Sequence, residues 1–266
     1  MSVQVQSFFH RDSNTFSYLV SDPASGEAAL IDPVLDYDPD TDASSEAPLH
    51  AALQAIEQQD LQLRWLLETH AHADHVSGGR RLKQRFPQAT LAIGEGIRAV
   101  QATFAPRYGL QLPAADEIFD HLFSDGETFT LGELRCQVIA VPGHTSDSIA
   151  YLIDDALFTG DSLFMPDGGT ARCDFPGGDA AQLYRSIQRL LALPDATRVF
   201  VCHDYGPGGR AFANETTIGE QRAHNIHVHD GVAEAEFVSV RQARDATLEE
   251  PKLMQPAVKA NIQGGA

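Results

Sequence analysis

Basic residues are scarce in this chain, whose 266 residues include 19 lysines and arginines against 37 aspartates and glutamates, a formal net charge of −18. A surface this acidic repels polyanions, so we expect neither nucleic acid nor an anionic membrane as the main partner. The sequence also lacks an apolar run of the roughly 20 residues that cross a membrane, and its first residues do not combine a basic with an apolar region. These features favour a soluble protein of the cytoplasm.

Cysteine is rare as well. The three cysteines, Cys136, Cys173 and Cys202, are widely spaced and form no C-x-x-C pair. This pattern favours reduced thiols over a disulfide framework or a structural zinc site. Cys136 and Cys202 fall in apolar runs typical of strands, so we expect both to be buried.

The hydrophobic content of 43% is enough for a substantial core, and the length fits one large α/β domain. We expect this domain to occupy residues 1–250. The remaining segment, 251–266, contains Pro251 and Pro256 and ends in Gly-Gly-Ala. We therefore expect it to be a loosely held tail.

Metal-binding residue types are concentrated in one short stretch. The apolar run Trp65-Leu66-Leu67 predicts a buried strand, and Ser77-Gly78-Gly79 opens a basic helix, so the residues between them form a loop. This loop, at the carboxyl end of a strand, holds His70, His72, Asp74 and His75. Crowded imidazoles and carboxylates gain little from folding unless a cation offsets their desolvation and repulsion. The stretch therefore predicts a metal site.

Three more predicted strands end in residues of the same kind. They are His144 in Pro142-Gly-His-Thr-Ser, Asp161 in Thr159-Gly-Asp-Ser, and His203 in Val201-Cys-His-Asp-Tyr205. Their separations along the chain are too long for a local zinc knuckle, so only a folded sheet could bring them together. Each of these residues taken singly is more often an ordinary polar loop residue, and the set together indicates a metal site.

Short β-rich runs and amphipathic helices appear in both halves of the chain. Strands are predicted over 16–20, 28–33, 63–67, 90–93, 128–131, 134–141, 149–153, 156–159 and 198–202. Helices are predicted over 48–59, 79–86, 180–191, 218–228 and 238–246, two of them capped by Asp179 and Thr217. The acidic stretch 36–46 is expected to be an exposed loop, and 97–125 loop and broken helix. Two sheets packed face to face with helices outside is the implied architecture.

The series of motifs resembles the metallo-β-lactamase superfamily, whose pattern is His-x-His-x-Asp-His, then a His, a bridging Asp and a last His. The resemblance implies an αββα sandwich of two mixed sheets, with the metal at one edge between them. The finer motifs, Gly143-His-Thr-Ser-Asp-Ser148, Thr159-Gly-Asp-Ser-Leu-Phe164, Ala171-Arg-Cys-Asp-Phe175 and His203-Asp-Tyr205, look like the persulfide dioxygenases. This implies oxidation of glutathione persulfide by O₂ and water to sulfite and glutathione at one non-haem iron(II) per chain.

By this resemblance, His70, His144 and Asp161 are the catalytic iron ligands, a two-His, one-carboxylate facial triad that leaves adjacent positions for the persulfide and O₂. His72, Asp74, His75 and His203 would surround the iron or bind a second metal ion. Residue identity alone leaves the number of metal ions open.

An acidic protein needs local basic groups to hold an anionic substrate. Arg172 matches the family's arginine, Asp174 could orient it, and Arg222 and Tyr205 complete the expected substrate contacts. Relatives carry Gly-Cys-Gly-Arg-Thr-Asp where this chain has Gly168-Gly-Thr-Ala-Arg-Cys-Asp174. Because the cysteine is displaced, no catalytic role is assigned to Cys173.

Two alternatives stay open. Glyoxalase II is similar in the first motif and would be a two-zinc thioester hydrolase in which Asp161 bridges the metal ions. A metal- or persulfide-binding sensor would use the same pocket without turnover. The carrier thiol and the oligomeric state, a homodimer included, are not determined by the sequence.

Overall fold

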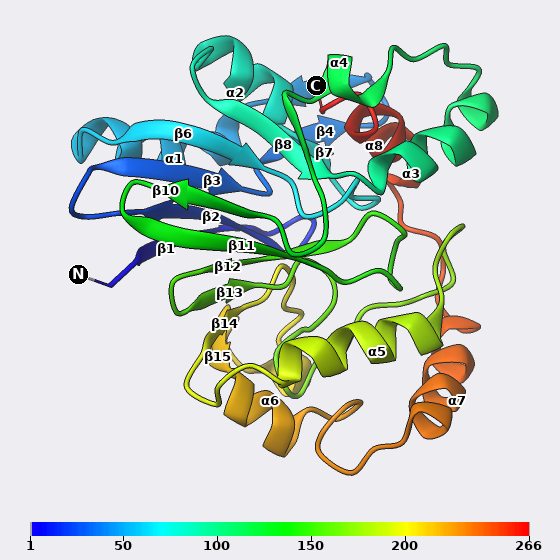
Figure 1. Ribbon diagram of the computed structural model, residues 1–266. Coiled ribbons are helices and arrows are strands. Elements are labelled where there is room, and N and C mark those ends of the chain that lie inside the picture. The colour runs from blue at the N-terminus through cyan, green and yellow to red at the C-terminus, as the bar shows by residue number, and fades with distance from the viewer. Residues whose placement is uncertain (1, 266) are drawn as a thin grey trace.

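Two six-stranded sheets face each other in the computed structural model, which describes residues 2–265 (Figure 1). The first has the strand order β1 (Gln4–His10), β2 (Thr15–Ser21), β3 (Glu27–Ile31), β6 (Gln62–Leu67), β8 (Thr90–Gly94) and β9 (His121–Phe123). The second has the order β10 (Thr128–Leu131), β11 (Leu134–Ala140), β12 (Ile149–Ile153), β13 (Ala156–Phe158), β14 (Arg198–Phe200) and β15 (Glu215–Thr217). Helices lie outside both sheets, so the predicted αββα sandwich is confirmed.

Both sheets are mixed. In the first, β1, β2 and β3 pair antiparallel, whereas β3, β6, β8 and β9 pair parallel. In the second, β13 and β14 pair parallel and the other neighbouring strands pair antiparallel.

Aromatic side chains fill the space between the sheets. Tyr18 of β2 packs edge-on against Phe158 and Phe200, at centroid distances of 5.2 and 5.5 Å. Tyr151 of β12 reaches across and donates a hydrogen bond to the Glu68 carbonyl at 2.8 Å. Full burial of each such side chain contributes about 1.5–3 kcal/mol. This core therefore holds the strand ends of both sheets, and the loops beyond them, in one place.

The first sheet is covered by α1 (His50–Gln58), α2 (Gly79–Arg85), α3 (Ile97–Phe104) and α8 (Met254–Asn261), and the second by α5 (Ala180–Leu191), α6 (Ile218–His224) and α7 (Glu234–Asp245). Both predicted caps form: Asp179 accepts from Gln182 N at 2.7 Å, and Thr217 from Glu220 N at 3.2 Å. The shorter elements are η1 (Ala47–Leu49), η2 (Pro106–Tyr108), α4 (Ala115–Ile118) and η3 (Pro207–Gly209). Within residues 2–265 no helix is both long and apolar enough to cross a membrane.

The acidic stretch after β3 is largely exposed, as expected, but it is not a loop. It forms a hairpin of β4 (Val34–Asp38) and β5 (Ala43–Ser45), and β4 also pairs with β7 (Val76–Ser77). Asp38 closes the turn by accepting hydrogen bonds from Asp40 N at 2.9 Å and Thr41 Oγ1 at 2.8 Å. The carboxylates that suggested a loop are therefore the turn-forming residues of a hairpin.

The expectation of a loosely held tail is also wrong. Helix α8 lies beside β7 (Figure 1), and its residues Ala257 and Val258, with Ile262 beyond it, are buried. These apolar side chains pack in the same cluster as α1 and α3, which a reading based on two prolines and terminal glycines could not show. The boundary of the domain at residue 250 stays a prediction.

Three further differences concern the sheet edges and one helix end. Strands β1 and β15, at the edges of the two sheets, were not predicted: β15 is entirely polar, and the apolar residues of β1 are interspersed with polar ones. Helix α6 ends at His224, four residues before the predicted end, because the Asn225 side chain accepts from His227 N at 2.9 Å and caps the turn.

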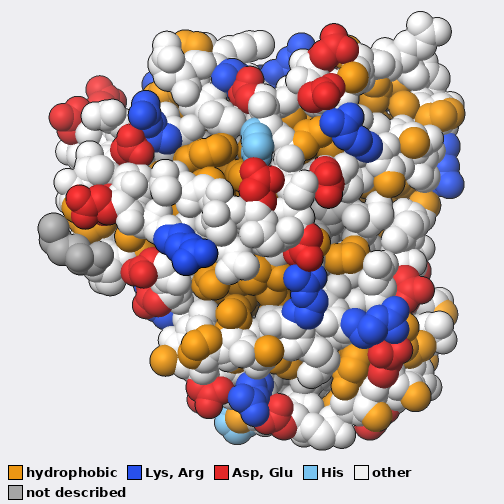
Figure 2. Space-filling model, viewed as in Figure 1, with side chains coloured by type: hydrophobic (Ala, Val, Ile, Leu, Met, Phe, Trp, Pro, Cys, Tyr) orange, Lys and Arg blue, Asp and Glu red, His pale blue; other side chains and the backbone are white. Residues whose placement is uncertain are grey.

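On the face shown in Figure 2, acidic and basic side chains are interspersed.

Candidate metal centre

Four loops bring the predicted ligands to one edge of the sandwich. The loop after β6 carries four of them, and the loops after β11, β13 and β14 carry one each. The residues are His70, His72, Asp74, His75, His144, Asp161 and His203. The sequence prediction that folding would unite these distant residues is therefore correct.

The residues predicted to bind iron form one compact group. His70 Nε2 and His144 Nε2 lie 3.9 and 3.5 Å from Asp161 Oδ2, and all three side chains are buried. Nitrogen and oxygen ligands bind a metal ion at about 2.0–2.2 Å, so atoms with these separations can share one ion. Two imidazoles and one carboxylate are the donor set of a facial triad.

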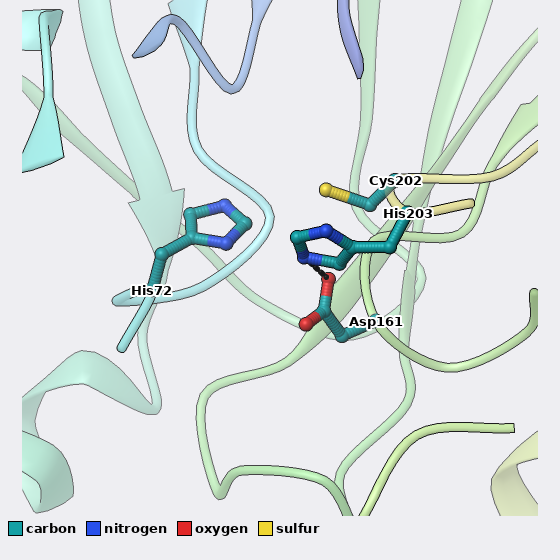
Figure 3. A group of neighbouring side chains, drawn as sticks. All are labelled: His72, Asp161, Cys202 and His203. Atoms are coloured by element: carbon teal, nitrogen blue, oxygen red, sulfur yellow. Dashed lines mark ion pairs between the residues drawn. The ribbon is translucent and has the colours of Figure 1, made fainter. Parts of the chain in front are cut away.

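The other carboxylate oxygen of Asp161 faces a second group. Asp161 Oδ1 lies 3.3 Å from His203 Nε2 (Figure 3). His203 Nε2 in turn lies 3.7 Å from Asp74 Oδ2. His75 Nδ1 lies 3.2 Å from the same Asp74 oxygen. Asp161 thus stands between two sets of ligands, as a bridging carboxylate would, and the geometry accommodates one metal ion or two.

A residue that sequence reasoning left out joins this second group. The Cys202 thiol lies close to His72, Asp161 and His203 (Figure 3), with their ligand atoms all within 4.8 Å of one another. Burial and neighbouring carboxylates raise the pKa of this thiol well above its usual value. Cys202 therefore stays protonated unless a metal ion binds it.

Several buried nitrogen and oxygen atoms of the site make no hydrogen bond. Among the described residues, His72 Nδ1, His75 Nε2 and Asp161 Oδ1 are buried without a hydrogen-bond partner. Each such atom costs about 1–3 kcal/mol if it stays unsatisfied. Imidazole nitrogens and carboxylate oxygens gathered around shared space are suited to a divalent cation, so the residues present fit a metal ion.

The charges of the site support the same conclusion. Burial opposes the ionisation of Asp161, but the neighbouring His203 imidazole, which faces it, outweighs burial and holds the pKa of Asp161 well below its usual range. Burial also lowers the pKa of His70, which keeps it neutral. An ionised carboxylate beside a neutral imidazole is the state in which these groups bind metal.

The raised pKa values of two histidines indicate that carboxylates outweigh cations around the site. Burial lowers the pKa of His72 and His203, but carboxylates outweigh it, Asp32 for His72 and Asp161 for His203, and raise these pKa values to about 10 and about 9. Without a metal ion, the carboxylates thus favour the protonated, positively charged forms of both histidines. A divalent cation would take the place of those protons.

The backbone of the metal loop is held by carboxylates that the sequence did not single out. Asp32, at the end of β3, accepts hydrogen bonds from Thr69 N at 2.7 Å and Thr69 Oγ1 at 2.9 Å, and faces His72 Nε2 at 3.2 Å. Asp147 accepts from Ala71 N at 2.8 Å. Such outer contacts orient metal ligands. A signal for Asp32 was present, because it ends an apolar strand just before Pro33.

His144 is oriented by a loop from the second half of the chain. Its Nδ1 donates to the Arg172 carbonyl at 2.7 Å, so Nε2 is left free to face Asp161. The Arg172 loop is itself held by α7: Arg241 Nη1 donates to the Thr170 carbonyl at 2.9 Å, and Asp245 Oδ2 accepts from Cys173 N at 2.8 Å.

The metal centre opens into a cleft of about 1170 Å³. The β4–β5 hairpin lines it with Asp36 and Asp38, whereas α7 and the segment that follows contribute Arg244 and Lys252. Tyr205 is 58% exposed and stacks on His203 at a centroid distance of 6.0 Å. The cleft therefore offers both acidic and basic groups, and an aromatic wall, to a small molecule at the metal.

Arg172 lines this cleft, as expected of a substrate contact. Its guanidinium forms a two-fold ion pair with Asp174, at 2.6 and 2.7 Å, and donates to the Glu249 carbonyl at 2.7 Å. It also lies over the Phe175 ring, 4.7 Å from the centroid. Asp174 thus orients Arg172, and the guanidinium keeps N–H groups for a ligand because it has five in all.

The expected substrate contact of Arg222 is wrong. The cleft lining, taken over the described residues, leaves Arg222 out. This side chain lies on α6 and pairs at 3.0 Å with both Asp195 and Asp230. The sequence shows that α6 follows His203, but it does not show which side of the helix faces the site.

A cluster of histidines and aspartates at the edge of an αββα sandwich defines a metal-binding enzyme fold. The family model described as the metallo-beta-lactamase superfamily matches residues 10–203. The chain belongs to this superfamily.

Several relatives match over nearly the whole chain. A probable metallo-hydrolase of Burkholderia pseudomallei is 44% identical, and glyoxylase B2 of Dictyostelium discoideum 42%, each over 98% of this chain and 92% and 91% of those proteins. The mitochondrial persulfide dioxygenase ETHE1 of Homo sapiens is 30% identical over 99% of this chain and 89% of that protein. The crystal structure of ETHE1 from Myxococcus xanthus is similar with a TM-score of 0.80 and 34% identity, covering 99% of this chain and 100% of that one.

Proposed function

We propose that the protein is a persulfide dioxygenase, which oxidises glutathione persulfide with O₂ and water to sulfite and glutathione. One iron(II) per chain would be held by His70, His144 and Asp161. The observation that carries the proposal is the similarity to ETHE1 from Myxococcus xanthus over the full length of both chains, C-terminal segment included. The finer motifs around His144, Asp161 and Arg172 support it.

Iron(II) in a facial triad supplies adjacent coordination positions for a sulfur ligand and O₂. The reaction converts one persulfide anion, one O₂ and one water into glutathione, sulfite and one proton. Four electrons pass from the persulfide to O₂. The chain's own residues must therefore position the persulfide beside the metal and receive its charged ends in the cleft.

The cleft suits a substrate with charges of both signs. Glutathione carries one ammonium and two carboxylate groups. Arg172, Arg244 and Lys252 can bind the carboxylates, and Asp36, which lines the same cleft, can bind the ammonium. Tyr205 provides an aromatic surface near the metal ligands. This charge pattern supports a peptide-like carrier thiol.

A second candidate is a two-zinc thioester hydrolase of the glyoxalase II kind. The position of Asp161 between two ligand sets favours this hydrolase, as does the 42% sequence identity to glyoxylase B2. In that case His72, Asp74, His75 and His203 would bind metal directly.

Cytoplasmic location and assembly as a homodimer stay predictions from the sequence.

Metal analysis separates the two candidates. The protein is purified without added metal, its iron and zinc are counted, and O₂ uptake with glutathione persulfide is compared with anaerobic hydrolysis of a glutathione thioester. We expect one iron per chain and O₂ uptake. His70→Ala, His144→Ala and Asp161→Ala should each lose both iron and activity, whereas His203→Ala should keep most of the iron at lower activity. Two tightly bound zinc ions with thioester hydrolysis would refute the proposal.

A further inference from the structure

Asn261, the last residue of α8, binds the backbone of the metal loop from the far end of the chain. Its Nδ2 donates to the carbonyls of His72 and His75, and its Oδ1 accepts from Ser77 N, each at 2.8 Å. The side chain is 4% exposed. One amide therefore closes three backbone hydrogen bonds of the segment 72–77.

This set of bonds requires an amide side chain. Two carbonyls need two donors and the N–H needs an acceptor, and among apolar or small polar residues only asparagine and glutamine offer both. Buried backbone groups that lose such partners cost about 1–3 kcal/mol each. The loop has no ladder of its own between His72 and His75, so it depends on this side chain.

The contacts on the two sides of the loop are complementary. Asp32 and Asp147 hold the start of the loop, at Thr69 and Ala71. Asn261 holds its second half, at His72 and His75. The backbone on either side of Asp74 is thus bonded to a residue of the C-terminal segment.

Helix α8 is docked by other contacts as well. Gln101 Nε2 donates to the Ile262 carbonyl at 2.8 Å, and the Gly264 carbonyl accepts from Arg80 N at 2.9 Å. Ala257 and Ile262 are fully buried. The helix should therefore stay in place when Asn261 changes, and Gln101 provides a matched control that holds the same segment without contacting the metal loop.

We propose that Asn261 is a positioning residue for the metal centre, which sets the backbone of residues 72–77 and through it the affinity for metal. The inference rests on the metal centre described above, but it holds whether that centre carries iron for oxygen chemistry or zinc for hydrolysis. The C-terminal segment is then a working part of the site.

Two readouts test this in the full-length protein. One is the affinity of the apoprotein for iron(II) and for zinc(II), measured by competition with a chelator. The other is hydrogen exchange of the amides in residues 72–77 of the apoprotein, which needs neither metal nor activity. The variants are Asn261→Leu, similar in size without polar atoms, Asn261→Ser, which keeps one hydroxyl, and the control Gln101→Leu.

We expect Asn261→Leu to bind both metals about 10- to 100-fold more weakly, as other changes around metal ligands do, and to exchange the 72–77 amides faster. Asn261→Ser should fall between it and the wild type, and it decides the test if the leucine variant does not fold. Gln101→Leu should resemble the wild type in both readouts. Wild-type affinity and exchange in Asn261→Ser and Asn261→Leu would overturn the proposal, and so would an equal loss in Gln101→Leu, which would assign the effect to docking of the helix. Failure of the dioxygenase assay alone would leave these two readouts unchanged.

Discussion

Replacing Arg241 by methionine should destabilise the protein strongly, although this residue contacts no metal ligand. Arg241 and Asp245 are 2% and 5% exposed and form an ion pair at 2.6 Å on α7. An acidic residue at a helix C-terminus is unfavourable for the helix itself. The pair instead binds the loop that orients His144, through Thr170 and Cys173.

The magnitude follows from the burial of the pair. Breaking a buried ion pair by removing one partner costs about 3–5 kcal/mol, because the other charge stays buried. For a chain of this size each kcal/mol lowers the melting temperature by about 2–4 °C. Arg241→Met should therefore unfold about 6–20 °C below the wild type.

The double variant Arg241→Met with Asp245→Leu separates the charge from the packing. It removes the Asp245 carboxylate, which would otherwise stay buried without a partner, but it leaves Cys173 N without an acceptor, at a cost of about 1–3 kcal/mol. We expect it to be more stable than Arg241→Met, measured by urea unfolding at pH 7. A cost below about 1 kcal/mol for the single variant, or a double variant no more stable than the single one, would refute this reasoning.

Three further predictions concern single side chains. Arg172→Leu should lower kcat/KM for glutathione persulfide about ten- to a hundred-fold at equal iron content, because a charge-assisted bond is worth about 1.5–3 kcal/mol. The control Arg222→Leu should match the wild type in the same kinetics, and equal values for both variants would remove Arg172 from the substrate site. Cys173→Ser should keep substantial turnover, because burial raises the pKa of this thiol to about 12 and leaves it unreactive; a folded but inactive variant would contradict this. Burial lowers the pKa of His227 to about 4, so the unfolded chain takes up a proton near pH 6.5 that the folded chain excludes. Urea unfolding should therefore show the wild type losing stability as the pH falls from about 6.5 to about 4, with a smaller loss in His227→Gln, and an equal loss in both would show that His227 is not responsible.

The candidate ligands of the metal centre were predictable because each lies in a short, recognisable stretch of sequence. Each of His70, His144, Asp161 and His203 lies within three residues of the end of an apolar run, and a loop after a strand places its residues at the edge of a sheet. Crowded imidazoles and carboxylates also have few uses other than metal binding. The strands and capped helices were predictable for the same reason, since their signals lie within a few residues.

Directions in space were not predictable in this way. Arg172 and Arg222 both follow metal ligands in the sequence, but only Arg172 lines the cleft, because the rotation of α6 depends on which of its faces packs against the second sheet. The hairpin at 34–45 was hidden for a similar reason. Its acidic residues resemble a loop until β7 is present to pair with β4.

The sequence by itself therefore predicted which residues come together as candidate metal ligands, since the chemistry of a ligand and its place near a strand end are both local properties. Only the tertiary structure decided what holds those ligands in place. Asn261 lies in a segment that looks like a loose tail, and no sequence pattern connects it with His72 and His75, which are 189 and 186 residues away. Its role arises because α8 packs beside β7, and long-range packing of this kind depends on the burial of many side chains at once.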